Sequence, residues 1–358
     1  MDLAWGEDFA ALADVGKSVF ARYSPLEDRS NSVPIADQVA QFAELGWLQL
    51  GDPIGADGDS PSLSTIAGIF VEMGRTLAGT PLLDLTMARD AALVIGTETS
   101  AGIAERIGNG EAVVIPVFPS AEWGSALTYE NGVLRGVALA VGYADCADSF
   151  LVYAVTGESI VAVVDSRSSI SIEAMPNMGE YPMFAVTFDD VLVPDAAVLA
   201  RGGDAVRAVE VAEQRGAVLR AAQVYGAALR LLDITVLYAQ QRHQFGGSIG
   251  RFQAVQYLCT DIAIAAHLTS AHARSAAGAL DAGIDPQPHI GLMRKQAAKA
   301  ALQIVHSAHE VHAGIGYMVE SNVHLFTNAA KRWQYDFGAA AENNDSIVSA
   351  ITRIYEGA

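Results

Sequence analysis

Apolar and polar positions recur with the period of an α-helix through the first part of the chain. Between Phe9 and Phe20 apolar side chains return every three or four residues, and Pro25 closes the segment because proline cannot continue a helix. The same period predicts further helices over residues 35–48, 63–77, 81–96 and 101–108. We therefore expect a helical N-terminal domain over residues 1–111.

The pattern changes to that of short β-strands near residue 112. Runs rich in β-branched and aromatic residues follow one another, separated by turn residues at a spacing of about ten residues. Asn131-Gly132 lies between two such runs and predicts a hairpin with a primed turn, in which both turn residues take positive φ. The spacing predicts a small β-barrel or sandwich, which would form a middle domain over residues 112–202.

Helical spacing returns near Asp204 and predicts a long helix that ends at about Gln241. Further helices are expected after residue 252, over residues 290–313, and in two shorter segments, 323–333 and 347–355. We expect these helices to form a C-terminal bundle domain over residues 203–358. The predicted fold class is mainly α with a β domain in the middle of the chain.

A polar corner separates the first two long C-terminal helices. Arg242, Gln244 and Phe245 lie there, and the glycines that follow at 246, 247 and 250 allow the backbone to turn sharply. Apolar positions then resume at helical spacing from Phe252. A guanidinium, an amide and an aromatic ring at a turn suit a planar, anionic ligand.

Composition narrows the class of protein. The chain has 358 residues, 51% of them hydrophobic, so it can bury large cores. Its formal net charge of −19 argues against nucleic acid and anionic membrane surfaces as partners. The two cysteines, Cys146 and Cys259, lack metal-site spacing. We find no secretory signal and no apolar run near the roughly 20 residues of a membrane span, so a cytoplasmic protein is expected.

Two motifs in the C-terminal region carry a family resemblance. The first is R-x-Q-F-G from Arg242, followed by F-Q at Phe252, and the second is HEVHAGIGY over residues 309–317. Together they resemble the signatures of the acyl-CoA dehydrogenase family of flavoproteins. The resemblance implies a three-part fold, with an N-terminal helical domain, a middle β-barrel or sandwich and a C-terminal four-helix bundle. It also implies FAD, an acyl-CoA substrate and an electron-transfer flavoprotein as acceptor.

The resemblance assigns a set of residues to the adenosine and pyrophosphate of FAD, which in the family is held partly by a neighbouring subunit. These residues are Arg242, Gln244, Phe245, Gln253, Glu310, Gly314 and Gly316. Glu310 departs from the pattern, because the family has a glutamine there and an ionised carboxylate would repel a phosphate. Ala313 replaces the first glycine of a pair, which is a milder change.

Neither position at which the family places its catalytic glutamate holds a glutamate in this chain. One position falls on Phe337, and the other, 26 residues before Arg242, falls on Gly216. Neither side chain can accept a proton. Three carboxylates lie near these positions and could act instead: Asp336, Glu342 and Glu213.

The flavin-side loop of the middle domain is also reduced. Over residues 117–126 the chain keeps Gly124-Ser125 but lacks the Thr-Glu-Pro of the family, and the Trp-x-Thr strand is absent. The leading hypothesis is a non-catalytic partner in a heterotetramer, resembling actinobacterial enzymes for steroid side-chain thioesters, which pairs with a glutamate-bearing subunit. The alternatives are a self-sufficient homo-oligomeric dehydrogenase with a displaced base, and a flavin-free scaffold on the same fold.

Overall fold

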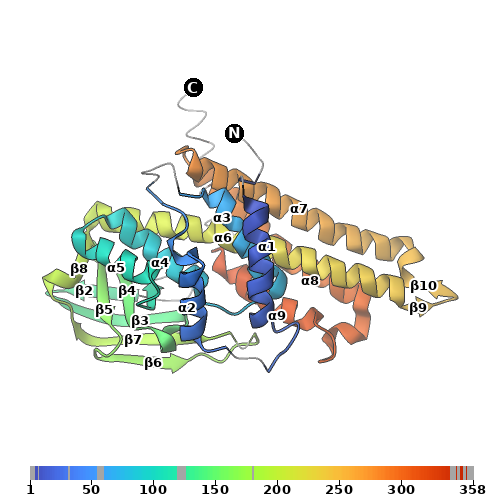
Figure 1. Cartoon of the computed structure of the whole chain (residues 1–358), viewed down its shortest axis with the longest axis horizontal. Helices are drawn as coiled ribbons and strands as arrows, with labels where there is room; N and C mark the ends of the chain where they lie inside the picture. The colour runs from blue at the N-terminus through green and yellow to red at the C-terminus, as the bar shows by residue number, and fades with distance from the viewer. Residues whose placement is uncertain are drawn as a thin grey trace. The chain divides into compact units, whose positions relative to one another are not determined.

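Figure 1 shows a computed structural model of the chain, which describes residues 5–6, 8–30, 33–54, 60–118, 126–179, 181–338, 344, 347–349 and 352. The chain divides into two compact units. One comprises Met1–Ser32, Ser62–Gly79 and Ala217–Ala358, and the other Val33–Pro61 and Thr80–Gly216. The elements follow the expected order of helices, strands and helices. The three domain boundaries expected from the sequence stay a prediction.

Five helices form where the apolar period predicts them. They are α1 (Phe9–Phe20), α2 (Ile35–Glu44), α3 (Leu63–Thr76), α4 (Leu82–Ile95) and α5 (Glu98–Gly108).

Two helix ends differ from the expectation for local reasons. α2 stops early because Gly46 takes a φ of 70°, and Trp47–Gln49 forms a separate short 3-10 turn. α5 begins earlier than expected, because the side chains of Thr97 and Ser100 each bind the other's backbone N–H in a capping box.

The strands form two four-stranded sheets. The first has the order β1-β4-β5-β8, with β1 (Val114–Val117), β4 (Ser149–Thr156), β5 (Glu158–Asp165) and β8 (Val198–Arg201). The second has the order β2-β3-β7-β6, with β2 (Ala126–Glu130), β3 (Val133–Gly142), β7 (Met183–Leu192) and β6 (Ile170–Ala174). Only the pairing of β1 with β4 is parallel among the described strands.

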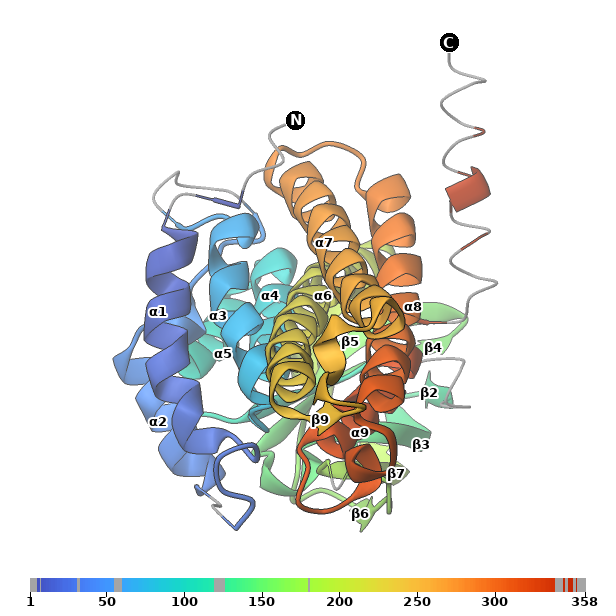
Figure 2. The same cartoon turned by 90° about the vertical axis from the view of Figure 1, so that its right-hand side faces the viewer.

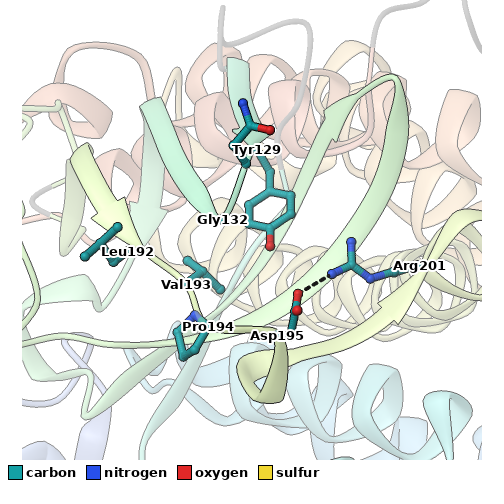
Figure 3. A pocket seen from close by; sticks show the side chains of 8 residues that line it. Tyr129, Gly132, Leu192, Val193, Pro194, Asp195 and Arg201 are labelled. Atoms are coloured by element: carbon teal, nitrogen blue, oxygen red, sulfur yellow. Dashed lines mark hydrogen bonds and ion pairs between the residues drawn. The ribbon is translucent and has the colours of Figure 1, made fainter.

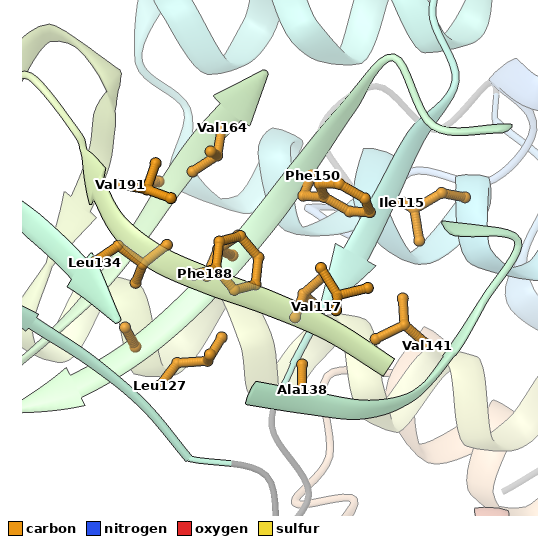
Figure 4. Packing of buried hydrophobic residues seen from close by; sticks show 14 of the residues in the cluster. Ile115, Val117, Leu127, Leu134, Ala138, Val141, Phe150, Val164, Phe188 and Val191 are labelled. Atoms are coloured by element: carbon orange, nitrogen blue, oxygen red, sulfur yellow. The ribbon is translucent and has the colours of Figure 1, made fainter. Parts of the chain in front are cut away.

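One apolar core draws side chains from both sheets, which confirms the predicted β domain (Figure 4). At its centre Phe150 of β4 and Phe188 of β7 pack edge to face with ring centroids 6.2 Å apart. The predicted hairpin is also confirmed: β2 pairs with β3, and Asn131 and Gly132 take φ values of 51° and 80°. Strand β8 was not predicted from the sequence, because four residues directly before a helix give no clear two-residue period.

The C-terminal helices are α6 (Gly202–Gln241), α7 (Gln253–Asp281), α8 (Gln287–His312) and α9 (Val323–Asp336). Figure 2 looks along them and shows α7 beside α8, its neighbour in the bundle. Glycine allows α3 and α6 to meet closely, since a Cβ at Gly226 would overlap the carbonyl oxygen of Val71. Among the described residues, no helix is long and apolar enough to cross a bilayer.

Candidate functional site

The polar corner after α6 is a short β-ribbon. Two two-residue strands, β9 (His243–Gln244) and β10 (Gly247–Ser248), pair in antiparallel fashion, and the N–H of Ile249 donates to the carbonyl oxygen of Arg242 at 2.8 Å. Phe245 and Gly246 turn the chain at φ values of 53° and 84°. This turn leaves the Phe245 side chain 84% exposed.

Two guanidinium groups lie at this corner without a carboxylate partner. Arg251 donates to the carbonyl oxygen of Phe245 and lies over the Phe252 ring, 4.9 Å from its centroid. Arg242 is exposed. Within the residues that the structure describes, neither arginine forms an ion pair. Both cations therefore remain available to an anion from outside the chain.

Two glutamines assigned from the sequence also lie on the surface near the corner. Gln244 is an exposed residue of β9, and Gln253 begins α7. The Gln253 amide donates to the hydroxyl of Tyr257 at 2.6 Å, one helical turn further along. This bond orients Gln253, while Gln244 has a solvent-facing amide.

The second motif forms a tight turn at the end of α8. A short 3-10 segment, η7 (Ala313–Tyr317), follows His312, and Ala313 adopts a φ of 52°, a region that favours glycine. Gly314 is exposed with open space where a Cβ would lie, whereas a Cβ at Gly316 would lie 2.8 Å from Nδ1 of His309. Glu310 is exposed on the last turn of α8.

Two histidines of α8 hold this turn, and sequence analysis did not assign them a role. The His309 ring stacks on Tyr317 at 4.2 Å, and the His312 ring stacks on Tyr238 at 4.3 Å. Tyr238 lies on α6, one turn before Arg242, so the second stack brings the two sequence motifs together. The only sequence signal was that both histidines flank Glu310.

The first base position is occupied by a buried phenylalanine. The Phe337 side chain is 1% exposed at the end of α9. The adjacent Asp336 is held by two arginines: its Oδ2 lies 3.2 Å from Nε of Arg220 and 3.3 Å from Nε of Arg332. The Asp336 carboxylate is therefore engaged by residues of α6 and α9. Glu342, a further candidate, lies outside the described residues.

The second base position is filled by a neighbouring side chain. A Cβ at Gly216 would lie 2.6 Å from Sδ of Met87 on α4. Beside it Nε of Arg215 donates to Oδ2 of Asp90 at 2.6 Å, and these residues are only 5% and 1% exposed. Burial raises the pKa of Asp90, against the opposing effect of Arg215. Glu213, the remaining candidate, is partly buried on the preceding turn.

A groove in the β domain was not expected from the sequence (Figure 3). Its volume is about 790 Å³, and it is lined by Tyr129, Asn131, Gly132, Leu192, Val193, Pro194, Asp195 and Arg201. The charge of Arg201 is paired there, because its guanidinium nitrogens lie 3.0 Å from Oδ1 of Asp195 and 4.0 Å from Oε2 of Glu158. The loop expected to contact flavin, with Gly124-Ser125, lies outside the described residues.

Known proteins resemble this chain in sequence and in structure. Residues 206–341 match the family model for the acyl-CoA dehydrogenase C-terminal domain. The cyclohex-1-ene-1-carbonyl-CoA dehydrogenase of Geobacter metallireducens is 28% identical over 318 residues, which cover 82% of this chain and 83% of the relative.

Two solved structures share the fold over almost the whole length. A chain of the ChsE4-ChsE5 complex from Mycobacterium tuberculosis superposes with a TM-score of 0.85 at 23% identity, covering 98% of this chain and 99% of that chain. The Tcur3481-Tcur3483 steroid ACAD gives a TM-score of 0.83 at 22% identity, covering 99% and 100%. These likenesses confirm the predicted fold class. Together with the sequence matches, they show that the chain is similar to acyl-CoA dehydrogenases.

Proposed function

We propose that this chain is the non-catalytic subunit of an FAD-dependent acyl-CoA dehydrogenase that introduces an α,β double bond into an acyl-CoA thioester. A related subunit in the same heterotetramer would supply the catalytic glutamate. The observation that carries the proposal is that neither base position can hold a proton acceptor: Phe337 is buried and Gly216 is packed against Met87. The relatives in complexes, named ChsE4-ChsE5 and steroid ACAD, favour a paired assembly and a bulky acyl group.

The reaction needs a base, and neither family position for that base holds one in this chain. Removal of the α-proton requires a carboxylate within hydrogen-bonding reach of the α-carbon. Phe337 and Gly216 have no such group, and Asp336, the residue that precedes Phe337, is bound to Arg220 and Arg332. When bound, FAD accepts the hydride removed from the β-carbon, and an electron-transfer flavoprotein would then reoxidise it. In the proposed assembly the proton is taken by a residue of the partner.

The exposed corner and turn fit the pyrophosphate of an FAD shared with that partner. Arg242 is a surface cation that forms no ion pair with the described residues, Gln244 and Phe245 follow it, and Gly314 leaves its backbone open to close approach. Gln253 lies at the start of α7 beside this corner. Glu310 opposes a phosphate electrostatically. We therefore assign Glu310 to the edge of the site, where it would face away from the phosphates.

Purification with and without the partner gene product tests the proposal. We expect the lone chain to carry little flavin, and the mixed complex to have the native mass of a heterotetramer with about half a flavin per chain. Native mass spectrometry and flavin absorbance per chain measure both quantities. One flavin per chain on the lone protein would overturn the proposal.

Two other functions give different results in the same preparation. A self-sufficient dehydrogenase with Asp336, Glu342 or Glu213 as base would oxidise acyl-CoA without a partner. A flavin-free scaffold, which the exposed carboxylate of Glu310 favours, would bind no flavin in either preparation. The unpaired Arg242 counts against the scaffold, because an exposed cation at a glycine-rich corner suits an anion.

A further inference from the structure

Two ring stacks connect the arginine corner with the glycine turn. Tyr238 of α6 and His312 of α8 lie face to face, with centroids 4.3 Å apart and planes inclined by 19°. Tyr238 precedes Arg242 by four residues, and His312 precedes Gly314 by two. The stack therefore fixes the distance between the two parts of the proposed pyrophosphate surface, although they are about 70 residues apart in sequence.

The second stack, between His309 and Tyr317, contacts the glycine turn. The His309 ring lies against Tyr317, with centroids 4.2 Å apart, and its Nε2 is 2.7 Å from the hydroxyl oxygen of Thr327 on α9. The hydrogen bond to Thr327 and the stack on Tyr317 hold the His309 ring in place. Gly316 has no room for a side chain, because a Cβ there would lie 2.8 Å from Nδ1 of His309. The path of the turn thus depends on where this imidazole lies.

Both imidazoles are held in surroundings that disfavour a positive charge. Within the described residues, Nδ1 of His309 and Nε2 of His312 are buried and lack hydrogen-bond partners. Burial, and then His324 and His306, lower the pKa of His309. Burial, and then His309, lower the pKa of His312 to about 4.

Other groups around the pair do not offset this effect. Tyr317 and Tyr238 face the two imidazoles through their rings. Glu310 lies between the histidines in sequence but on the exposed side of α8. Among the residues that the structure describes, no carboxylate acts on the pKa of either imidazole.

We propose that His309 and His312 are positioning residues that lock the arginine corner and the glycine turn into one preformed FAD-binding surface, and that protonation opens this lock. This inference rests on the proposed function, because it assumes that the surface receives FAD. It adds a regulatory property to that site: the subunit holds the dinucleotide at neutral pH and releases it in acid.

The direction of the pH effect follows from the direction of the pKa shifts. An opened lock exposes both histidines to water, where they titrate near 6.5, whereas the closed lock keeps them neutral to a lower pH. The closed state is fully favoured above about pH 6.5 and loses stability as the pH falls toward about 4. A new positive charge would also attract the pyrophosphate, but His312 is buried and His309 partly buried, so we expect the loss of hydration to outweigh this attraction.

The flavin-loaded complex provides the first test, with FAD dissociation followed by flavin fluorescence. We expect the Kd at about pH 5.5 to be higher than at about pH 7.5, by up to about tenfold from the His312 shift. His312→Phe keeps a ring against Tyr238 and cannot be protonated, so it should flatten this dependence. His272→Phe is the matched control, because His272 on α7 also has a pKa lowered by burial but lies outside the two stacks. A flat wild-type profile, tighter binding in acid, or a flattened His272→Phe profile would overturn the inference.

Histidine titration in the lone chain provides a second test that needs no flavin. Proton NMR of the imidazole rings, assigned with His309→Asn and His312→Phe, should show both histidines titrating below the ordinary imidazole value of about 6.5. Ordinary titration of His312 near 6.5 would refute the lock whether or not the complex binds FAD. A complex without flavin would instead refute the proposed function. The titration of the two histidines would still show whether their rings stay neutral in the closed arrangement.

Discussion

At the scale of single residues, the contacts of Gly216 decide what its position can do. Met87 fills the space that a side chain would need, so the absence of a base there is built into the packing. At the other base position, Phe337 is buried and its neighbour Asp336 is committed to two arginines. At both positions, the residues of this chain therefore contribute to packing inside the protein.

A methyl group at Gly216 should test this packing. Gly216→Ala places a Cβ 2.6 Å from the Met87 sulfur, so we expect it to lower the free energy of unfolding by about 1–3 kcal/mol. Gly102→Ala is the control, since a Cβ there meets nothing within 4 Å inside helix α5, and it should be neutral or stabilising. Urea denaturation of both variants measures the difference. Equal stability of the two would show that the position is open.

At the scale of elements, helices α4 and α6 are joined by the buried Asp90–Arg215 pair. The two residues are 125 positions apart in sequence, and their ion pair is closed to water. Removal of one partner leaves the other charge uncompensated in the interior. An exposed pair of the same chemistry, Arg201–Asp195, connects β8 to the preceding loop and offers a direct comparison.

We expect Asp90→Asn to destabilise the chain by about 3–5 kcal/mol, because Arg215 would keep its charge without a carboxylate. Asp195→Asn removes an ion pair at the surface and should cost less than about 1 kcal/mol. Thermal unfolding at neutral pH compares the two variants. A small effect at Asp90 would mean that water reaches the pair.

The elements also show how far sequence reasoning can reach. Periodic apolar spacing located α1 to α9 within a few residues, and Asn131-Gly132 specified the hairpin, because both signals are local. The Asp90–Arg215 pair and the ring stacks of His309 and His312 were not predicted, since they depend on contacts between helices far apart in sequence. The turn at Phe245 and Gly246 could be predicted because a glycine-rich turn is a local signal, and the role of its residues in binding stays a prediction.

At the scale of the whole molecule, an acidic chain presents a local cationic corner. The formal net charge is −19, yet Arg242 and Arg251 have no carboxylate partner within the described residues. Local charge, and not net charge, then governs binding of an anionic dinucleotide, and added salt should weaken that binding.

Substitution at the corner should weaken FAD binding in the assembled complex. Arg242→Ala removes a charge-assisted hydrogen-bond donor, so we expect the Kd for FAD to rise by about tenfold to a hundredfold and its salt dependence to become shallower. Arg135→Ala is the control, because that exposed arginine of β3 is paired with Asp190. Flavin fluorescence titration at two salt concentrations measures both. An unchanged Kd for Arg242→Ala would remove the corner from the site.

The central claim is that this chain contributes no base to the reaction. The most direct measurement is anaerobic flavin bleaching after addition of acyl-CoA thioesters, including a steroid side-chain thioester, to the lone chain mixed with excess FAD and to the complex. We expect no bleaching in the lone chain, bleaching in the complex, and an unchanged rate when the complex carries Asp336→Asn in this chain. Bleaching by the lone chain, abolished by Asp336→Asn, would contradict the account and identify Asp336 as the base.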